Sequence, residues 1–461
     1  MTKATVGIDP VAQWAAGRLG VSAELLTQET IRRYQLSEIR KTVALARQKS
    51  SFYAARLAAF PPDWPSSLED FCMTPLTSQT DVSASGPAFL CAPQSEISRI
   101  VTLETSGTTG ERKRIFFTAA DQQLALNFFA HGIRSMSSRG DRMMIALPCE
   151  RAGSVGYQLA LGISGAGVVP IPHGLIGNLS STLARMDEEQ ATMLIGLPVQ
   201  VLALAHDRSD VARRVFQRIH TIVLCSDHVS RSLAERVRIA TGCAIFEHYG
   251  STEMGLGGGL ECRGHDGYHL READLYFEIV SPETGESLPD GEVGEVVFTT
   301  LGRVGMPLIR YRTGDLSYIL GDACPCGLPL RRAGRIRDRI DSAMSLGPAG
   351  SITISALDEA LFAIPQLLDF SATLVQGRPT CLEICVYAPK AGKTFPAEVR
   401  HALAAVPSIA ANSAIGALRL KVARRNDLCP VMGAKRRIRW TRTEADSAYS
   451  ARNVERELSL S

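Results

Sequence analysis

The sequence predicts an α/β fold, in which a large N-terminal domain of parallel-sheet α/β subdomains with a β-rich subdomain precedes a small α+β C-terminal domain. Three observations predict it. Short apolar runs alternate with helical stretches in the first half of the chain, which is typical of buried parallel strands joined by helices. A strand-rich stretch with tight turns follows. A second α/β pattern then begins after residue 334.

Hydrophobic patterning places the individual elements. Helical stretches show apolar residues at intervals of three and four, and strands show short apolar runs. In the β-rich stretch, the turn Pro289-Asp290-Gly291 separates two strands. In chain order we expect a helical lead-in at 30–59, a strand at 143–147, a helix at 181–186, strands at 193–197 and 221–225, a helix at 230–240, a strand-rich stretch at 275–319, a helix at 355–362 and strands at 371–375 and 381–386.

Length and charge limit the kinds of protein that this chain can be. With 461 residues the chain exceeds one ordinary core, so at least two domains are expected. We place them at 1–336, with a β-rich subdomain near 262–334, and at 337–461. The formal net charge of +3 provides no general attraction to nucleic acid or to membranes.

The sequence contains no stretch typical of a targeting or membrane-spanning segment. Residues 1–20 include Asp9, Gln13 and Arg18, and no run approaches the roughly 18 apolar residues of a spanning helix. Most of the eleven cysteines are isolated within apolar segments, as buried, reduced cysteines are. We therefore expect a cytoplasmic enzyme without a nucleic-acid or membrane partner.

The stretch from Thr105 to Lys113 has the composition of a phosphate-binding loop. Its two glycines let backbone N–H groups approach an anion, its four hydroxyls add donors, and its lysine adds a mobile positive charge. Arg112 stands where the P-loop pattern counted from Gly107 requires glycine, so P-loop NTPase chemistry is excluded. A solvated Ser/Thr/Gly turn is the alternative interpretation.

Three later motifs lie where strands or domains are expected to end. Residues 247–253 (Glu-His-Tyr-Gly-Ser-Thr-Glu) offer an aromatic ring that can cover a base and a carboxylate that can hold Mg²⁺. Residues 310–315 (Arg-Tyr-Arg-Thr-Gly-Asp) place an aspartate at an expected turn, where it can accept both ribose hydroxyls. Residues 334–340 lie at the expected domain boundary as a hinge or a linker. A polar turn and a charged hairpin are the alternatives for the first two.

A candidate metal site combines a Cys-x-Cys turn with an upstream cysteine. Cys324 and Cys326 form the turn, and Cys262 precedes two histidines, His265 and His269. Four nitrogen and sulfur ligands suit structural Zn²⁺. The Cys-x-Cys spacing is tighter than that of a usual zinc knuckle, so surface-turn histidines are the alternative.

In this order, the four motifs outside the cysteine cluster resemble those of the adenylate-forming superfamily of acyl-CoA synthetases, adenylation domains and luciferases. The chain is more similar to the phenylacetate-CoA ligase branch, and the resemblance runs from about residue 30 to residue 440. The stretches that carry it are 35–36, 51–57, 67–71, 75–78, 267–269, 291–296 and 306–315. Members of this branch carry a similar Cys…His…Cys-x-Cys set, which favours zinc on Cys262, His269, Cys324 and Cys326, with His265 as the alternative ligand.

The resemblance implies two half-reactions and a role for each motif. ATP and Mg²⁺ would activate a carboxylic acid as its acyl-adenylate, and coenzyme A would then displace AMP. Lys113 and Glu253 would be catalytic, with Glu253 carrying Mg²⁺, and the small C-terminal domain would move about Asp338. The implied nucleotide-binding set is Thr105, Ser106, Gly107, Thr108, Thr109, Gly110, His248, Tyr249, Gly250, Ser251, Thr252, Asp315 and Arg335.

One position departs from the family pattern, in which a lysine directly follows a glycine near the C-terminus and takes part in adenylation. Here Gly433 is followed by Ala434 and then by Lys435. Either Lys435 fills the role after a shift of one position, or the lysine is absent and the first half-reaction is weakened. We favour Lys435 as the third catalytic residue.

Three functions remain open at this point. The favoured one is an AMP-forming carboxylate-CoA ligase acting on an aryl or arylalkyl acid. The second is a stand-alone adenylating enzyme that loads a carrier-protein thiol or another nucleophile. The third is a non-catalytic nucleotide-binding protein, against which Glu253, Asp315 and Arg335 argue. The oligomeric state stays open, a homodimer included.

Overall fold

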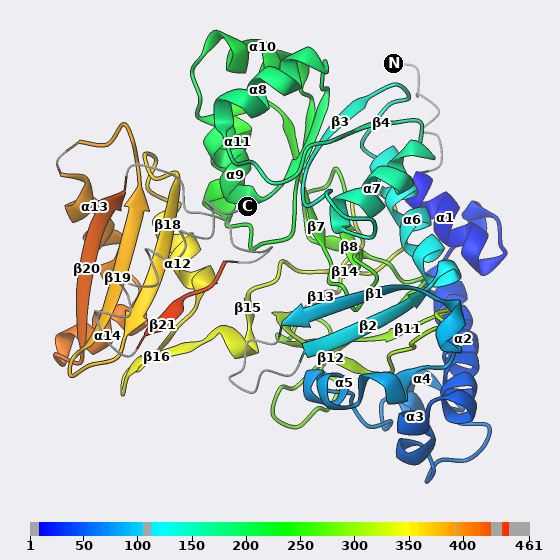
Figure 1. The fold of residues 1–461 in the computed structure, drawn as a ribbon. Helices are drawn as coiled ribbons and strands as arrows, with labels where there is room; N and C mark the ends of the chain where they lie inside the picture. Colours follow the sequence, from blue (N-terminus) through cyan, green and yellow to red (C-terminus); the bar gives the residue numbers. More distant parts are fainter. Residues whose placement is uncertain (1–8, 105–111, 393, 426–435, 442–461) are drawn as a thin grey trace. The chain divides into compact units, whose positions relative to one another are not determined.

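The computed structural model describes residues 9–104, 112–392, 394–425 and 436–441 (Figure 1). The chain folds into two compact units. The first consists of residues 1–174, 192–194 and 246–337, and the second of residues 175–191, 195–245 and 338–461. The chain passes into the second unit at Asp338, next to the boundary expected at residue 337, but the second unit also includes two earlier stretches.

Helices make up the N-terminal part of the first unit. They are α1 (Pro10–Leu19), η1 (Ala23–Leu25), α2 (Gln28–Lys49), α3 (Ser51–Arg56), α4 (Leu68–Phe71), α5 (Gln79–Ser85), η2 (Gly86–Phe89) and η3 (Gln94–Glu96). The long helix α2 starts at Thr27, whose hydroxyl accepts a hydrogen bond from the Thr30 backbone N–H. Ile31, Ile39 and Val43 repeat at helical spacing and are buried, so the apolar face of α2 packs on the core.

The remaining elements of the first unit are mainly strands. They are β1 (Ile97–Glu104), β2 (Arg112–Thr118), α6 (Ala119–Arg134), β3 (Arg142–Ala146), α7 (Val155–Ser164), β4 (Val169–Pro172), the end of β7 (Ala244–Tyr249), β8 (Gly259–Glu261), β9 (Tyr268–Leu270), β10 (Leu275–Val280), β11 (Gly294–Thr300), β12 (Tyr311–Ser317), β13 (Ile319–Leu320) and β14 (Arg332–Ala333). The predicted α/β class is confirmed.

Strand pairing brings the sequence motifs of the first unit onto a few sheets. β1 and β2 pair antiparallel on either side of residues 105–111. β3 and β4 are parallel, whereas β7 is followed by antiparallel pairing through β8, β9, β14 and β13. β10, β11 and β12 form an antiparallel meander. An aromatic-rich core that includes Tyr53, Phe71 and Phe298 packs among these elements.

The third motif does not form the expected turn. Asp315 lies inside strand β12, between residues that are hydrogen-bonded to β11. The pairing of the two strands slips between Glu295 and Val297, and Gly314 takes a φ of 76° at this bulge. Only glycine adopts this conformation without strain, and the bulge directs the Asp315 side chain from within a strand.

The second unit combines two groups of strands with helices. Its elements are α8 (Leu179–Glu188), the end of β5 (Met193–Gly196), α9 (Pro198–Ala205), α10 (Asp210–Arg218), β6 (Thr221–Leu224), α11 (Arg231–Thr241), β15 (Asp338–Arg339), η4 (Ile340–Ser342), β16 (Met344–Gly347), β17 (Gly350–Ile352), α12 (Ile354–Leu361), β18 (Asp369–Val375), β19 (Thr380–Tyr387), α13 (Phe395–Ala404), α14 (Pro407–Ala414), β20 (Leu418–Arg425) and β21 (Arg439–Thr441). Four of these strands form a mixed sheet in the order β20-β19-β18-β21 (Figure 1). Within the described ranges, none of the helices has the length and apolar character needed to cross a membrane.

Candidate active site

A buried lysine and a buried glutamate meet in the first unit. Lys113, the last residue of the phosphate-loop motif, lies on β2, and Glu253 lies in the turn after β7. The Lys113 ammonium is ion-paired with Oε1 of Glu253, and each residue is only 6% exposed. The Tyr311 hydroxyl donates to the same carboxylate oxygen at 3.1 Å and accepts from the Lys113 ammonium, also at 3.1 Å. The three side chains therefore form one hydrogen-bonded cluster, and the Lys113 ammonium also donates to Oε1 of Gln79 at 3.4 Å.

The electrostatics of this cluster keep Glu253 ionised. Burial by itself would raise the pKa of the carboxyl group. The charge and hydrogen bond of Lys113 outweigh burial and lower the pKa of Glu253 to about 2. A buried, ionised carboxylate is a hard oxygen donor of the kind that Mg²⁺ prefers, so Glu253 fits the role that its motif predicts.

Arg303 holds the main chain at Glu253. Its guanidinium donates to the backbone oxygens of Glu253, at 2.7 Å, and of Phe116, at 3.2 Å. It also lies over the ring of Phe117, with its central carbon 4.4 Å from the ring centroid. Arg303 thus ties the turn after β7 to strand β2, and the sequence motifs did not point to it.

A second polar network connects β7 with β12. Tyr249, the last residue of β7, donates a hydrogen bond of 2.9 Å from its hydroxyl to Oδ2 of Asp315. Its ring stacks on that of Tyr268, with centroids 6.0 Å apart. The Tyr268 hydroxyl donates at 3.0 Å to Glu247, which is also ion-paired with Arg335. This network thereby brings together residues from three sequence motifs, namely Glu247, Tyr249, Asp315 and Arg335. It adds Tyr268, to which the sequence motifs gave no role.

The turn after β7 requires its small residue. A Cβ at Gly250 would collide with the main-chain oxygen of Leu256, because the chain folds back closely here. The backbone N–H of Leu256 donates to the Ser251 oxygen at 2.8 Å, and that of Gly255 donates to the Thr252 oxygen at 3.0 Å. This tight turn places Glu253 close to the end of β7.

His248 differs from its neighbour Tyr249 in its surroundings. Successive side chains of a strand point to opposite faces, and the His248 ring lies 6.1 Å from the Phe129 ring of α6. Burial, together with the nearby Arg271 charge, lowers the pKa of His248 to about 4. The imidazole is therefore neutral at pH 7. Of the predicted nucleotide-binding residues, His248 lies apart from the Tyr249 and Asp315 pair.

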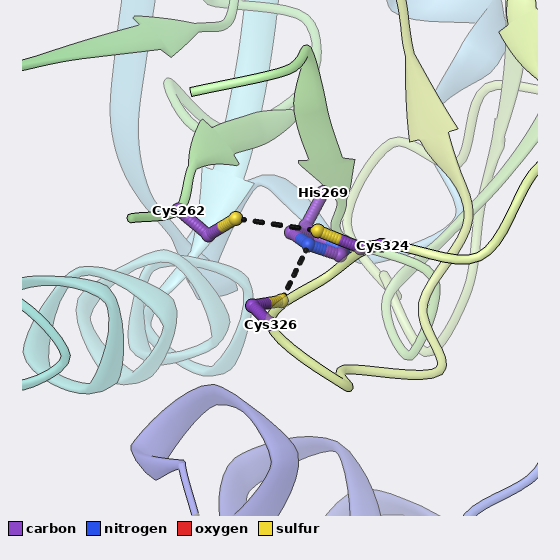
Figure 2. Close-up of side chains that lie close together, drawn as sticks. All are labelled: Cys262, His269, Cys324 and Cys326. Atoms are coloured by element: carbon purple, nitrogen blue, oxygen red, sulfur yellow. Dashed lines mark hydrogen bonds between the residues drawn. The ribbon is translucent and has the colours of Figure 1, made fainter. Parts of the chain in front are cut away.

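Cys262, His269, Cys324 and Cys326 form a compact cluster in the first unit (Figure 2). Their ligand atoms all lie within 4.8 Å of one another. Cys262 Sγ is 3.5 Å from Cys324 Sγ, and Cys326 Sγ is 3.2 Å from His269 Nε2. Figure 2 shows the three sulfur atoms and the imidazole converging on one point.

The surroundings of the cluster suit a metal ion. His269 Nδ1 lies 3.0 Å from the Leu330 carbonyl oxygen, so Nδ1 carries the proton and Nε2 is available as a ligand. Backbone N–H groups of Gly264 and Leu328 donate to the sulfurs of Cys262 and Cys326. Three sulfurs and one nitrogen match a structural zinc site.

His265, the alternative metal ligand, lies outside this cluster. It is about half exposed and has a φ of 50°, and its Nδ1 lies 3.4 Å from a carboxylate oxygen of Glu261. The cluster of four ligand atoms contains His269 and not His265. The geometry therefore favours His269 of the two histidines.

Some predicted residues fall outside the described part of the chain. These are Thr105, Ser106, Gly107, Thr108, Thr109, Gly110 and Lys435. Sequence reasoning gave no role to Tyr311, Tyr268 or Arg303. Tyr311 stands inside the third motif, two positions after the apolar run that ends at Ile309, and this position is the one signal that could have identified it.

Comparison with known proteins identifies the class first. A family model described as AMP-binding enzyme matches residues 71–302, half of the chain. The chain therefore belongs to the AMP-binding enzyme family, and the predicted membership of the adenylate-forming superfamily is confirmed.

Individual relatives then identify the branch. The phenylacetate-coenzyme A ligase of Thermus thermophilus is 28% identical over 421 residues, covering 87% of this chain and 91% of the relative. That of Pseudomonas putida is 29% identical over 358 residues, covering 75% and 78%. Among solved structures, 2-hydroxyisobutyryl-CoA ligase with its acyl-adenylate has a TM-score of 0.76 at 20% identity, covering 93% of both chains. The chain lies in the phenylacetate-CoA ligase-like branch.

Proposed function

We propose that this protein is an AMP-forming carboxylate-CoA ligase that activates an aryl or arylalkyl acid. The observation that carries the proposal is the buried pair of Lys113 and Glu253, joined by Tyr311, within a chain whose curated relatives are phenylacetate-coenzyme A ligases. ATP, the acid and coenzyme A are then the small-molecule partners.

In the first half-reaction, an oxygen of the substrate carboxylate attacks the α-phosphorus of ATP. The bond from this phosphorus to the oxygen of the departing pyrophosphate breaks, and an acyl-adenylate forms. Lys113 supplies a positive charge beside the phosphate-loop motif, and its ammonium can transfer from Glu253 to phosphate oxygens as their charge increases. Mg²⁺ held by Glu253 would neutralise phosphate charge. The Tyr311 hydroxyl would keep its hydrogen bond to the Glu253 carboxylate during this step.

Tyr249, Asp315 and Arg335 form the nucleoside side of the proposed site. Asp315 is fixed by the bulge at Gly314 and by the Tyr249 hydroxyl, so its carboxylate is oriented before ribose hydroxyls donate to it. The rings of Tyr249 and Tyr268 provide an apolar wall suited to a base. Arg335, now paired with Glu247, would turn toward ribose or phosphate.

In the second half-reaction, the thiol of coenzyme A loses its proton to solvent, its sulfur attacks the carbonyl carbon of the acyl-adenylate, and the bond from this carbon to the phosphate oxygen of AMP breaks. A free carboxylate would have to expel oxide to transfer its acyl group, and AMP is a far better leaving group. The acid therefore has to be activated as its acyl-adenylate. Lys435 would serve adenylation, and Asp338 would be the hinge between the half-reactions. Asp338 Oδ1 accepts hydrogen bonds from the Arg339 backbone N–H at 2.8 Å and from the Ser342 hydroxyl at 3.0 Å.

We assign structural zinc to Cys262, His269, Cys324 and Cys326. His269 lies on β9, Cys262 directly follows β8, and the other two cysteines lie in the loop between β13 and β14, so the ion would clamp the β-rich part of the first unit. Four protein ligands leave zinc without an open position for substrate, so its contribution would be to stability.

The test is acid-dependent exchange of labelled pyrophosphate into ATP by the wild-type enzyme, measured with and without coenzyme A. We expect exchange with aryl or arylalkyl acids and its diversion into thioester when coenzyme A is added. Adenylation without thioester would instead identify a carrier-protein thiol or another nucleophile as the acceptor. No exchange with any acid would contradict the ligase.

A further inference from the structure

A partly buried arginine in the second unit, Arg436, joins three separate segments. Arg436 lies three residues before the first residue of β21 (Arg439–Thr441), and its Nε is 2.9 Å from Oδ2 of Asp227. Its Nη2 is 2.7 Å from Oδ1 of Asp358, a fully buried residue of α12. The loop after β6, helix α12 and the segment before β21 thus meet at one guanidinium.

The cluster contains further groups that orient this arginine. The guanidinium lies 5.2 Å from the ring centroids of both Phe362 and Phe370, so its flat faces are covered by apolar surface. The other oxygen of Asp358 is 3.1 Å from Nδ1 of His228, which follows Asp227 in the chain. Asp358 is therefore held by two side chains and has little freedom to follow Arg436.

A second arginine attaches α12 independently of Arg436. The guanidinium of Arg236, on α11, donates to the backbone oxygens of Phe362, Ile364 and Leu367 at 2.8 to 3.2 Å and to that of Pro365 at 2.8 Å. A cation at the carboxyl end of a helix is favourable because orphan carbonyls gather there. Loss of Arg436 would accordingly leave α12 attached to α11.

The chemistry of this cluster indicates that Arg436 positions the segments it contacts rather than adding to the overall stability of the fold. Removing an arginine and two carboxylates from water costs free energy, and this cost offsets much of their electrostatic attraction. Apolar residues of similar volume would therefore stabilise the fold as well. A forked guanidinium that bridges two acids instead fixes distances and directions. Arg436 also follows Lys435 directly, and consecutive Cα atoms are about 3.8 Å apart.

We infer that Arg436 is a positioning residue of the ligase, which fastens the segment before β21 to Asp227 and Asp358 and so restricts where the preceding Lys435 can act. The inference rests on the proposed function, in particular on Lys435 as the adenylation lysine. It predicts that the two half-reactions respond differently to the loss of Arg436.

The test compares the half-reactions in Arg436→Gln and in Arg437→Gln. Arg437 is exposed and is the next residue in the chain, so its substitution removes an equal charge without touching the contacts of Arg436. At saturating ATP, we expect Arg436→Gln to slow acid-dependent pyrophosphate exchange by about ten- to a hundredfold, as a displaced catalytic group does. Thioester formation from supplied acyl-adenylate should fall less than about threefold. Arg437→Gln should resemble the wild type.

A double-mutant cycle identifies the partner. Asp227→Asn should slow exchange to a similar degree, and the double variant with Arg436→Gln should be no slower than either single variant, because the two residues act as one unit. Additive losses, equal losses in both half-reactions, or the same loss in Arg437→Gln would overturn the inference.

A readout without substrate separates this inference from the proposed function. Amide hydrogen exchange in β21 (Arg439–Thr441) should accelerate at least about tenfold in Arg436→Gln and stay unchanged in Arg437→Gln, since the anchor of the strand is lost. Unaltered exchange in β21 would overturn the anchoring role even in an active ligase. If amide exchange in β21 accelerates in Arg436→Gln but the wild-type protein adenylates no acid, the anchoring role of Arg436 is supported and the proposed ligase function is contradicted.

Discussion

Tyr249 donates a hydrogen bond of 2.9 Å to Asp315, a residue 66 positions later in the chain. The tyrosine ends β7 and the aspartate lies at a bulge of β12, so the pair depends on the fold and not on sequence proximity. In the proposed site, this bond orients the carboxylate that binds ribose. The same relationship gives the first of four predictions.

Tyr249→Phe removes the hydroxyl and keeps the ring. Asp315 then loses the donor that orients it, and we expect KM for ATP to rise about tenfold, the value of one hydrogen bond to a charged group. The measurement is the ATP dependence of acid-driven pyrophosphate exchange. Tyr387→Phe, on β19 of the second unit, is the matched control. An unchanged KM in Tyr249→Phe would exclude the orienting role.

Glu253→Gln removes the carboxylate charge while preserving shape. We expect adenylation to slow by about a hundredfold at limiting Mg²⁺, because an amide oxygen holds the ion poorly and the Lys113 ammonium loses its ionic partner. Pyrophosphate exchange measured over a range of Mg²⁺ concentrations tests this, with the exposed Glu283→Gln as control. A rate equal to that of the wild type at low Mg²⁺ would remove Glu253 from metal binding.

The first unit should lose stability when the pH falls below about 6.5, owing to His248. Burial lowers the folded pKa of His248 to about 4, whereas an unfolded histidine titrates near 6.5. The neutral form is therefore favoured on folding, and its contribution is complete above pH 6.5 and is lost as the pH falls toward 4.

The free energy of unfolding should thus decrease by about 2 kcal/mol more in the wild type than in His248→Gln between pH 7.5 and pH 5. Urea unfolding at both pH values is the measurement. His401→Gln, an exposed histidine of α13, should retain the wild-type decrease. The same decrease in His248→Gln as in the wild type would show that this imidazole does not titrate as described.

Zinc content should depend on the cluster of Cys262, His269, Cys324 and Cys326 and not on His265. We expect the purified wild type to contain about one zinc per chain, His265→Ala to keep it, and Cys326→Ser to lose it together with several degrees of thermal stability. Elemental analysis and thermal unfolding of the same preparations provide both readouts. Metal-free wild-type protein, or loss of zinc in His265→Ala, would contradict the assignment.

The sequence predicted those parts of the fold that depend on local pattern. The apolar runs at 143–147, 193–197 and 221–225 correspond to β3, β5 and β6, because strands buried on both faces need uninterrupted apolar residues. The helix expected at 230–240 is α11, which begins after the capping residue Ser230.

The turn expected around Asp315 was wrong for a physical reason. A glycine among polar residues is typical of turns, and the same left-handed backbone also makes a bulge within a strand. Only the pairing of β12 with β11 distinguishes the two, and this pairing is long-range. The predicted motifs therefore located Asp315 correctly as a residue, but not its conformation.

The partners of the candidate site residues were also beyond sequence reasoning. Arg303 reaches the backbone of Glu253 from 50 positions away, and Lys113 meets Glu253 across 140 positions. Residue types and motif order predict that such groups belong to one site. Which atom contacts which depends on the packing of whole elements, and this is visible only in the structure.

The most direct test of ligase activity is to identify by mass the products that the wild-type enzyme forms with ATP, Mg²⁺, coenzyme A and a panel of aryl, arylalkyl and aliphatic acids. We predict acyl-CoA and AMP in equal amounts with aryl or arylalkyl acids. AMP formation without acyl-CoA, or no product with any acid, would contradict it.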